Sequence, residues 1–399
     1  MSKESEKQSL KDHRDIGRDL DLFIFNDVAP GAPFWLPKGM VIFRELENWL
    51  RNLFKREGIV EVSTPILVNK KLWERSGHWE KFKENMFLLK DGEQDFALKP
   101  MNCPEAALIY ESDIRSYNDL PLRFAEIGRL HRNEVSGSLG GLFRVRQLTM
   151  DDLHIFCTPD QIQDEIINVL KHFQYFFETF GFTKVDYFLS TKPDKSLGDN
   201  ALWEKAQNAL KDALKSNAIT YQTKDKEGAF YGPKIDIDIE DSQGRKWQLS
   251  TVQLDFNIPE RFKLKYTDKD GSLKQPVIVH RAIFGTFERF IGILLEHTQG
   301  ALPTWLSPVQ VALLPVSDQF NNFAQKIATK LKDNDIRVEV DESNESVGKK
   351  VRNAELQKVP YYVVIGQKEV ASGKLSVKSR ETNIVKEITL EDFLKEIIA

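Results

Sequence analysis

Apolar residues recur at helical spacing around residues 40–57. Separations of three and four positions are typical of a helix with one buried face. The residues are Ile42, Phe43, Leu46, Trp49, Leu50, Leu53 and Phe54. Gly58 follows where a helix end favours a residue that tolerates positive φ. A short strand is expected at 59–62, and residues 1–15, which are poor in apolar positions, are expected to form a solvated lead-in.

A second helix is predicted over residues 159–180. Thr158 can cap it, Pro159 suits its first position, and Gly181 can close it. Its aromatic residues form a stripe along the helix, which favours a core face over a binding site. They are Phe173, Tyr175, Phe176, Phe177 and Phe180.

Strict alternation of apolar and acidic residues predicts a strand over 234–240, KIDIDIE. The isoleucines share one face of this strand, so Asp236 and Asp238 share the other. Two carboxylates on one face are compatible with a metal site, but a solvated face is the more common arrangement and is the one expected. Further strand patterns cover 246–256 and the start of 276–298, where a helix follows Gly285.

The order of the elements changes near residue 305. Before it, strands with inserted helices lack the regular alternation of a parallel doubly wound sheet. After Pro308, strands alternate with helices, which is typical of a small α/β domain with parallel pairing. The strands are predicted at 309–315, 336–340, 361–366, 374–379 and 384–388, and the helices at 318–333, at 346–358 and from Thr389. We therefore expect an α+β chain with two domains, 1–305 and 306–399.

The composition excludes several classes of protein. The chain has 399 residues, 41% apolar and 29% charged, with a net charge of -4, which is an ordinary balance for a globular protein. A local basic surface is still compatible with this charge, so nucleic-acid binding is not excluded. Cys103 and Cys157 are too few for a disulfide-rich secreted scaffold. Neither a signal peptide nor a membrane-spanning stretch is recognisable, so we expect a cytoplasmic protein without a membrane partner.

Arginines are concentrated around one predicted hairpin loop. The P-loop and dinucleotide fingerprints are lacking, since the glycines at 137–141 are not followed by Lys-Ser/Thr. Arginine forks suit phosphate and carboxylate oxygens, so the loop cluster indicates an anionic substrate. A solvated hairpin fits the same residues equally well. The cluster comprises Arg129, Arg132, Glu134, Arg144 and Arg146.

Several blocks in the chain carry a specific resemblance. PLRFAEIGRLHRNEVSGSLGGLFRVRQLTMDDLHIF resembles motif 2 of the class II aminoacyl-tRNA synthetases in its threonyl form, and FGTFERFIG resembles motif 3. REGIVEVSTPILVNKKLWERSGHW is similar to motif 1 and the loop after it. KPMNCPE, EGAFYGPKIDI, WQLSTVQLDF and PVIVHRAI are similar to blocks of the threonyl-tRNA synthetases. The similarity runs from about Asp12 to the C-terminus, with the blocks in the order of that family.

The resemblance implies a six- or seven-stranded antiparallel sheet up to about residue 305, followed by an α/β anticodon-binding domain. It implies activation of L-threonine by ATP with Mg²⁺, and transfer of threonine to tRNA(Thr). Arg132 would hold the α-phosphate and the amino-acid carboxylate, and Arg289 the γ-phosphate. Glu134 would contact the adenine side and Arg144 the bent triphosphate. Further ATP contacts are implied at Leu148, Gln248 and Thr251.

Three residues match the zinc ligands of the family, with one Zn²⁺ per subunit: Cys103, His154 and His280. Their separations are too long to form a recognisable zinc motif, and each alone would more often be a buried core residue. Three protein ligands leave one position open, as in catalytic zinc sites. Threonine can offer its amino group and hydroxyl to such a site, whereas valine lacks the hydroxyl and can be rejected.

The resemblance also assigns the residues around this position. Asp152 would accept the hydrogen bond of the substrate hydroxyl, and the other pocket residues are Met101, Tyr231, Lys234 and Gln253. His78 matches a histidine implicated in transferring threonine to the terminal ribose. The implied catalytic residues are therefore Arg132, Arg289, His78 and Lys234.

In the second domain, the resemblance places anticodon contacts at Asn344, Arg352, Glu369 and Lys378. Side chains of these types can read base edges in unstacked RNA. At Lys378 the family more often has arginine, and an ordinary surface role is an equally good interpretation, because lysine makes no bidentate contact. Motif 1, around Pro65, forms the subunit interface in this class, so a homodimer is expected.

The chain departs from the family pattern at three places. Glu105-Ala106 replaces Gly-His after the zinc cysteine, Leu148 replaces a phenylalanine that stacks on adenine, and Met150 replaces a glutamine of the substrate site. An aliphatic contact is expected to bind ATP more weakly, and a thioether lacks the donors of an amide. One alternative is therefore a paralogue with another acceptor or with inhibitor resistance, although the anticodon-type domain argues against it. A non-enzymatic RNA-binding protein is disfavoured by the retained arginines and zinc ligands.

The sequence begins where the catalytic core of the family begins, so the small N-terminal domain and the editing domain are expected to be absent. Serine carries the same hydroxyl as threonine, and a zinc site rejects it poorly. Such a chain is expected to mischarge serine and not to clear it in cis.

Overall fold

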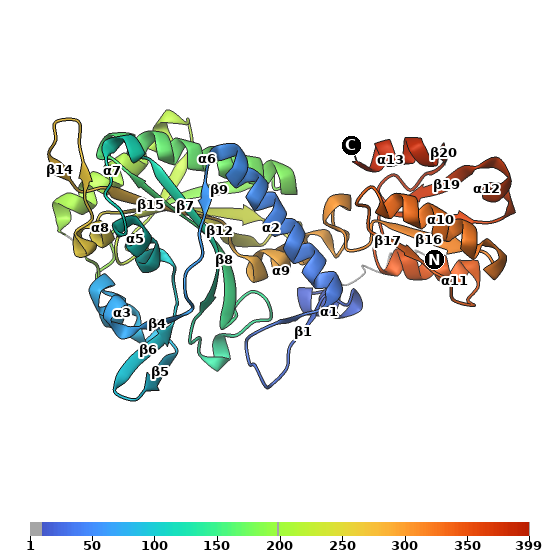
Figure 1. Ribbon diagram of the computed structural model, residues 1–399, viewed down its shortest axis with the longest axis horizontal. Coiled ribbons are helices and arrows are strands. Elements are labelled where there is room, and N and C mark those ends of the chain that lie inside the picture. The colour runs from blue at the N-terminus through green and yellow to red at the C-terminus, as the bar shows by residue number, and fades with distance from the viewer. Residues whose placement is uncertain (1–9, 198, 399) are drawn as a thin grey trace, which may run out of the picture. The chain divides into compact units, whose positions relative to one another are not determined.

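The computed structural model describes residues 10–197 and 199–398 (Figure 1). Contacts divide the chain into two compact units. The large unit contains Phe25–Pro33 and Leu50–Ile293, and the small unit contains the residues up to Ile24, Phe34–Trp49 and the chain from Leu294 onward. Within the described ranges, every helix is too short or too polar to cross a bilayer.

The large unit is built on an eight-stranded sheet with the strand order β10-β9-β11-β12-β15-β8-β7-β3. The strands are β3 (Val60–Glu61), β7 (Leu122–His131), β8 (Gln147–Cys157), β9 (Val185–Ser190), β10 (Tyr221–Lys224), β11 (Lys234–Glu240), β12 (Lys246–Asp255) and β15 (Val277–Thr286). Pairing is antiparallel from β9 to β7, whereas β10 and β3 join the two edges in parallel. The antiparallel sheet is confirmed, and the parallel edge strands bring it to eight strands where six or seven were expected.

Helices and a small second sheet complete the large unit. The second sheet has the order β4-β6-β5. Its strands are β4 (Leu67–Asn69), β5 (Leu88–Asp91) and β6 (Gln94–Leu98), and a hairpin is formed by β13 (Tyr266–Thr267) and β14 (Leu273–Lys274). The helices are α3 (Lys70–Ser76), α4 (His78–Phe82), α5 (Cys103–Glu111), α6 (Ile162–Phe180), α7 (Asn200–Ser216) and α8 (Asn257–Phe262), with α2 (Pro37–Glu57) and α9 (Phe287–Thr298) belonging partly to each unit.

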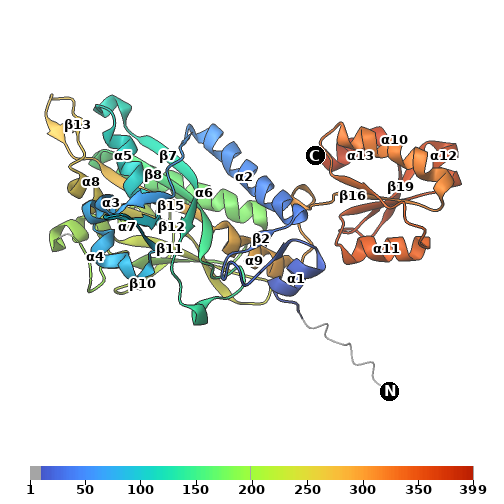
Figure 2. The ribbon, with the colours of Figure 1, turned by 60° about the horizontal axis from the view of Figure 1, so that its bottom comes forward.

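The helix α6 confirms the prediction over 159–180 and the role of its aromatic stripe. A short 3-10 turn at Pro159–Gln161 precedes it, Thr158 and Gln161 form a capping box, and Gly181 closes the helix with φ +75°. Figure 2 shows α6 running along the large sheet, and it packs on β12, β15 and α7. The phenylalanines of the stripe are buried, while Tyr175 is half-buried. The stripe is therefore core.

The predicted helix over 40–57 is also confirmed, as α2, and Gly58 follows it with φ +63°. The predicted lead-in is wrong from His13 onward, and its first nine residues lie outside the described ones. Residues His13–Asp19 form the helix α1, which Asp12 caps, and His13 Nδ1 lies 2.7 Å from Glu296 Oε1 in a buried pair. A partner so distant in sequence left no local pattern.

The strand at 234–240 is confirmed as β11, but a solvated acidic face is wrong for Asp236. The side chain of Asp236 is buried, with a residue exposure of 1%, while Asp238 is half-buried. Asp236 accepts hydrogen bonds from neighbouring strands, including one from Ser190 Oγ on β9. Asp236 is buried because side chains of β9 and β12 donate to its carboxylate and surround it.

The small unit contains the alternating elements expected after residue 308. Its main sheet has the order β17-β16-β18-β19-β20, in which β17, β16 and β18 run parallel and the last two pairs are antiparallel. The elements are β16 (Val311–Pro315), α10 (Asn321–Lys332), β17 (Val338–Val340), α11 (Val347–Leu356), β18 (Tyr361–Ile365), α12 (Gln367–Ser372), β19 (Lys374–Ser379), β20 (Val385–Thr389) and α13 (Leu390–Ile398), with a hairpin of β1 (Phe23–Ile24) and β2 (Phe34–Trp35) before α2. Only α12 among these later helices was not predicted, because six residues carry little helical periodicity.

His172 on α6 makes the stability of the fold dependent on pH. Burial, with smaller effects of Arg281, Arg123 and Arg56, lowers its pKa to about 3, and Glu57 Oε2 lies 3.5 Å from its Nε2. The folded pKa lies below the ordinary value of 6.5, so the unfolded chain binds this proton more readily. The stabilisation is complete above pH 6.5 and is lost as the pH falls toward 3.

His172 should make the free energy of unfolding of the wild type fall by about 2 kcal/mol between about pH 7 and pH 5. We expect His172→Leu to abolish this part of the pH dependence. Urea unfolding at the two pH values measures this difference. Gln174→Ala, on the exposed side of α6, serves as the control and should leave the pH dependence unchanged. Equal pH slopes for wild type and His172→Leu would contradict the assignment.

Candidate active site

A cavity of about 400 Å³ lies in the large unit, on the face of the sheet that carries Asp236. It contains many of the residues implied by the resemblance, namely Met101, Cys103, Arg132, Asp152, His154, Tyr231, Lys234, Thr251, Gln253 and His280. Met150, one of the departures from the family pattern, lines it too. Residues that the sequence did not single out complete the wall, among them Asn102, Glu227, Phe230, Arg281 and Gly285.

The register of the sheet explains why these residues meet. On neighbouring strands, one cross-strand row reads His154, His280, Gln253 and Lys234. The next row on the same face, two residues along each strand, reads Asp152, Ala282, Thr251 and Asp236. Directly opposed side chains in antiparallel strands are close neighbours. Segments distant in sequence therefore contribute to one surface.

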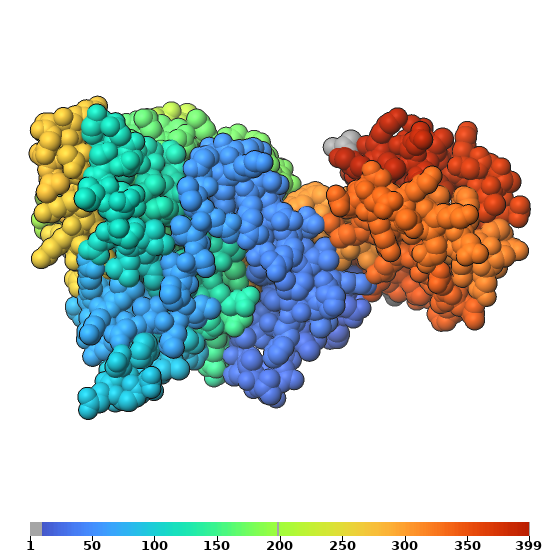
Figure 3. All heavy atoms as spheres, viewed as in Figure 1, coloured from blue at the N-terminus to red at the C-terminus, as the bar shows by residue number. Residues whose placement is uncertain are grey.

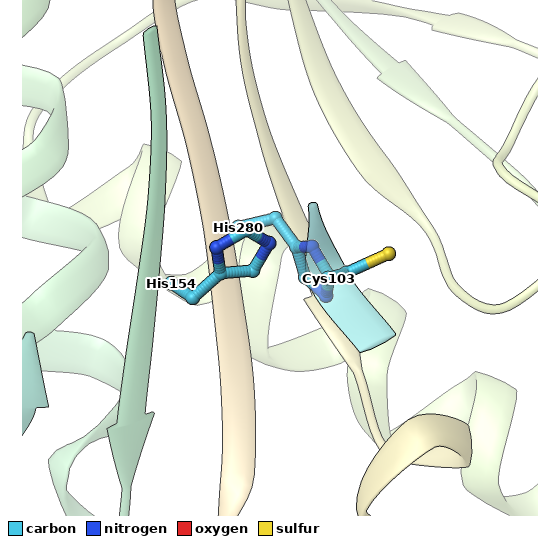
Figure 4. Close-up of side chains that lie close together, drawn as sticks. All are labelled: Cys103, His154 and His280. Atoms are coloured by element: carbon cyan, nitrogen blue, oxygen red, sulfur yellow. The ribbon is translucent and has the colours of Figure 1, made fainter. Parts of the chain in front are cut away.

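Cys103, His154 and His280 form a compact group that could hold a metal ion (Figure 4). One ligand atom from each lies within 4.8 Å of the others, and all three residues are buried. The two histidines face each other across β8 and β15, and Cys103 begins α5. Asp255 Oδ2 lies 3.1 Å from His280 Nε2, as carboxylates that orient metal-binding imidazoles do.

The electrostatics of this group favour a bound cation. Burial, and then the charges of Asp255 and Asp152, raises the pKa of the Cys103 thiol well above its usual value. Burial, and then His280, lowers the pKa of His154 well below its usual value. A neutral imidazole is ready to bind a metal, and a divalent ion offsets the cost of a buried thiolate. One sulfur and two nitrogens suit zinc.

Asp152 is held in place at the cavity by Asn102, which the sequence analysis did not single out. Asn102 Nδ2 donates to Asp152 Oδ2 at 2.7 Å. Burial raises the pKa of Asp152, and the hydrogen bond from Asn102 opposes that rise. Because Asn102 directly precedes Cys103 in the KPMNCPE block, its position beside a metal-ligand candidate was the available signal.

Arg132 points into the cavity from the loop between β7 and β8. Its Nε donates to the Pro100 carbonyl at 3.2 Å, and its guanidinium lies 6.0 Å from the centre of the Phe82 ring. The loop is the predicted hairpin, and Arg144 and Arg146 have bonds within it: Arg144 pairs with Glu134 at 2.8 Å, and Arg146 Nε donates to the Glu134 carbonyl. Of the two interpretations of the cluster, Arg132 fits the substrate site and the other two also fit a self-contained hairpin.

The remaining residues implied for ATP lie outside the cavity lining. Gln248 is exposed, and Arg289 is half-buried at the start of α9, with its guanidinium 5.9 Å from the centre of the Trp247 ring. Glu288, beside it, accepts from the backbone of Thr149, which ties motif 3 to β8. Leu148 is 4% exposed in a cluster with Leu130, Val145 and Met150.

His78 lies beneath the metal-ligand candidates and is fully buried. Its Nε2 lies 3.7 Å from Cys103 Sγ and 3.2 Å from Met101 Sδ, and its Nδ1 lies 2.9 Å from Ser76 Oγ. Burial, followed by the charge of His280, lowers the pKa of His78 to about 3. The imidazole is therefore neutral at physiological pH.

Glu105, the other departure in this block, is buried on α5, and burial raises its pKa to about 8. A carboxyl group kept neutral in this way stands on α5, two residues after Cys103, where the family pattern has glycine.

In the small unit, the residues implied for the anticodon have different environments. Asn344 and Arg352 are exposed, and Lys378 is half-buried with its Nζ donating to the Asn383 carbonyl at 2.6 Å. Glu369 is 6% exposed and accepts from Gly366 N and Ser376 Oγ, so it closes the start of α12. Their role in RNA recognition stays a prediction.

Comparison with known proteins shows which families the two parts of the chain resemble. Residues 82–298 match the family described as tRNA synthetase class II core domain (G, H, P, S and T), and residues 310–399 match the anticodon binding domain. The chain is 49% identical to a threonine–tRNA ligase of Caldanaerobacter subterraneus subsp. tengcongensis over 98% of its own length and 61% of that protein. It is 50% identical to the Thermotoga neapolitana enzyme over 98% and 61%. The chain thus spans about three fifths of these curated relatives, at 61%.

Two solved structures extend the similarity to the fold. One is described as the RNA binding domain of the threonyl-tRNA synthetase of Cryptosporidium parvum Iowa II. It has a TM-score of 0.94 and 41% identity, and covers 97% of this chain and 98% of that one. The other, a putative threonyl-tRNA synthetase of Aeropyrum pernix, has a TM-score of 0.85 and 30% identity and covers 97% of each chain. The chain belongs to the threonyl-tRNA synthetase family of the class II aminoacyl-tRNA synthetases.

Proposed function

We propose that this chain is a threonine–tRNA ligase, which activates L-threonine with ATP to threonyl-adenylate and transfers it to tRNA(Thr). The observation that carries the proposal is the meeting of Arg132, Asp152 and the Cys103, His154 and His280 group in one cavity. Residues 1–305 form the proposed catalytic domain and residues 306–399 the proposed anticodon-binding domain, with Asn344, Arg352, Glu369 and Lys378 as its proposed RNA contacts.

Cys103, His154 and His280 would hold one Zn²⁺, which their donor set and spacing fit. When bound, this ion would act as a Lewis acid that coordinates the amino group and hydroxyl of threonine. Asp152 accepts the hydrogen bond of that hydroxyl with the oxygen that Asn102 does not occupy. Valine leaves this buried acceptor unpaired, which is the physical basis for rejecting it.

Adenylation needs orientation and charge stabilisation more than proton transfer, because the threonine carboxylate is already ionised. One carboxylate oxygen attacks the α-phosphorus, the bond to the β-phosphate oxygen breaks, and pyrophosphate leaves with Mg²⁺. Arg132 and Lys234 supply positive charge at the cavity, and Arg289 and Arg144 supply it nearer the proposed triphosphate end. Fixed cations of this kind stabilise the transition state without reorganising.

Transfer to tRNA is the step for which His78 is proposed. The imidazole is neutral, so it can donate one hydrogen bond and accept another, but its pKa of about 3 makes it a poor general base. Its side chain lies behind Met101 and Cys103 and outside the cavity lining, so its proposed effect on the transfer would act through those two side chains.

Threonine-dependent ATP–pyrophosphate exchange tests the activation step. We expect exchange with threonine, no exchange with valine, and collapse of the threonine signal after zinc removal by a chelator. Cys103→Ser should lose the bound zinc, while Cys157→Ser, at the other buried cysteine, should keep one ion per chain in elemental analysis. Equal zinc content in the two variants would contradict the assigned ligands. Exchange with an amino acid other than threonine would instead favour a paralogue, because Met150 lines the cavity.

Serine should be mischarged by this 399-residue polypeptide. Serine carries the hydroxyl that Asp152 recognises, and losing one methyl group costs only about 1–3 kcal/mol of binding. Seryl-tRNA(Thr) should therefore form and persist in the presence of this polypeptide, which radiolabelled serine and acid gels can measure. Rapid breakdown of seryl-tRNA alongside stable threonyl-tRNA would contradict this expectation.

A homodimer through motif 1 is also proposed. Val60, Ile66 and Leu67 flank Pro65 and are 55%, 40% and 51% exposed, which supports an apolar contact with a second copy. Part of this light-blue segment lies at the surface in Figure 3. Light scattering should give the mass of a dimer for the wild type and of a monomer for Leu67→Asp, with Leu273→Asp on the β14 hairpin as the exposed control. A monomeric wild type would rule the interface out.

A further inference from the structure

Asp236 is a buried carboxylate whose two oxygens are both used by donors from three strands. Oδ2 accepts from Lys234 Nζ at 2.6 Å and from Ser190 Oγ at 2.7 Å. Oδ1 accepts from Gln248 Nε2 at 2.6 Å and from Thr251 Oγ1 at 3.2 Å. An ionised carboxylate has room for four such donors, so its hydrogen-bonding capacity is used.

Three of these donors have proposed roles at the active site. Lys234 and Thr251 line the cavity, and Gln248 is the proposed ATP contact next along β12. Asp236 itself does not line the cavity and has no proposed contact with either substrate. It therefore lies behind the reacting groups and contacts them from the sheet.

The carboxylate also determines which group donates and which accepts in a series of side-chain hydrogen bonds that extends from it. A carboxylate can only accept, so the Thr251 hydroxyl must donate to Asp236 and is left as an acceptor. Gln253 Nε2 lies 3.4 Å from Thr251 Oγ1 and fills that place. The amide oxygen of Gln253 then accepts from the Tyr231 hydroxyl at 2.5 Å. In this series, each hydrogen bond determines the donor of the next.

The series of hydrogen bonds ends at Tyr231, beside the metal-ligand candidates. The Tyr231 ring stacks on His280, with ring centres 5.1 Å apart. Gln253, Tyr231 and Lys234 are among the residues proposed to line the threonine pocket, whereas Gln248 and Thr251 are proposed ATP contacts. One buried carboxylate thus contacts both halves of the site.

We propose that Asp236 is the positioning residue of this active site, which aims Lys234 directly and orients Gln253 and Tyr231 through Thr251. The inference rests on the proposed function for its kinetic consequences, but not for its geometry. Asp238, two residues along the same face, differs in that it is half-buried and pairs with Lys224 at 3.2 Å. The same residue type on the same strand therefore has a separate role.

Asp236→Asn tests the proposal, because it keeps the shape and places an amide NH₂ against groups that donate. Hydrogen bonds to a charged group are stronger than those to a neutral amide, so kcat/KM for threonine-dependent exchange should fall by about 10–100-fold. The KM for threonine should rise as well as kcat falling. Asp186 lies on the adjacent β9 and forms a partly exposed ion pair with Lys246. Asp186→Asn removes this pair and should change exchange by less than about 2-fold.

A double-mutant cycle with Thr251→Val tests the route through Thr251. If Asp236 acts on the threonine pocket through that hydroxyl, the KM for threonine in the double variant should match that of the worse single variant. Multiplied effects on this KM would overturn the route. A lower melting temperature with unchanged kcat and KM in Asp236→Asn would overturn the positioning role and leave a structural one.

Crystal structures of wild type and Asp236→Asn separate this inference from the proposed function. Displaced Lys234 and Gln253 side chains would support the positioning role even if the wild type failed to exchange pyrophosphate, and that failure would count against the function alone. Unmoved Lys234, Gln253 and Tyr231 in the variant would overturn the inference whatever the wild type catalyses.

Discussion

The register of the central antiparallel strands is the constraint on which the whole site depends. Pairing of β8 with β15 sets His154 opposite His280, and pairing of β15 with β12 sets His280 opposite Gln253. Side chains alternate between the faces of a strand. If one strand slipped by one residue against its neighbour, its site residues would move to the opposite face of the sheet, into the hydrophobic core. The isoleucines of β11 resist such a slip, because each of them is fully buried on the other face. The hydrophobic core thereby holds the polar site in alignment.

A buried ion pair stabilises the end of the β8–β15 pairing, where motif 3 begins. The β8–β15 pairing is irregular between Ala282 and Thr286, and Asp151 accepts from the backbone nitrogens of Ile283 and Phe284 there. Arg281 balances this buried carboxylate with an ion pair of 3.1 Å. Irregular backbone at this depth needs such a partner, because unpaired buried amides are costly. The chain can then turn through Gly285 into α9.

The site gathers groups that burial would otherwise make unfavourable. Burial raises the pKa values of Cys103, Asp152 and Tyr231 and lowers those of His154 and Arg132. Each shift opposes the charged form, so anionic substrates, a cation and the fixed hydrogen bonds are worth more here than in water. A low-dielectric cavity of this kind suits a reaction that depends on orientation and charge.

Much of the fold could be predicted from local patterns. The 3.6-residue period predicted α2 and α6, alternation predicted β11, and the change of rhythm near residue 305 predicted the second sheet. Hydrophobic periodicity is a local property, so the sequence alone carries it. The family blocks added Cys103, His154 and His280, which no spacing rule would have joined, and the structure brings these three together.

What the sequence could not determine concerns partners that are distant along the chain. Asp236 was expected to be solvated, because alternation describes one strand and not what covers it. Only the pairing of β11 with β9 and β12 makes Asp236 a buried acceptor. Asn102 and His13 escaped notice for the same reason, since Asp152 and Glu296 reach them only in the folded chain. The sequence by itself determined the elements and the chemical types, and the tertiary structure determined which polar groups meet, because hydrogen-bond partners are set by distance in space.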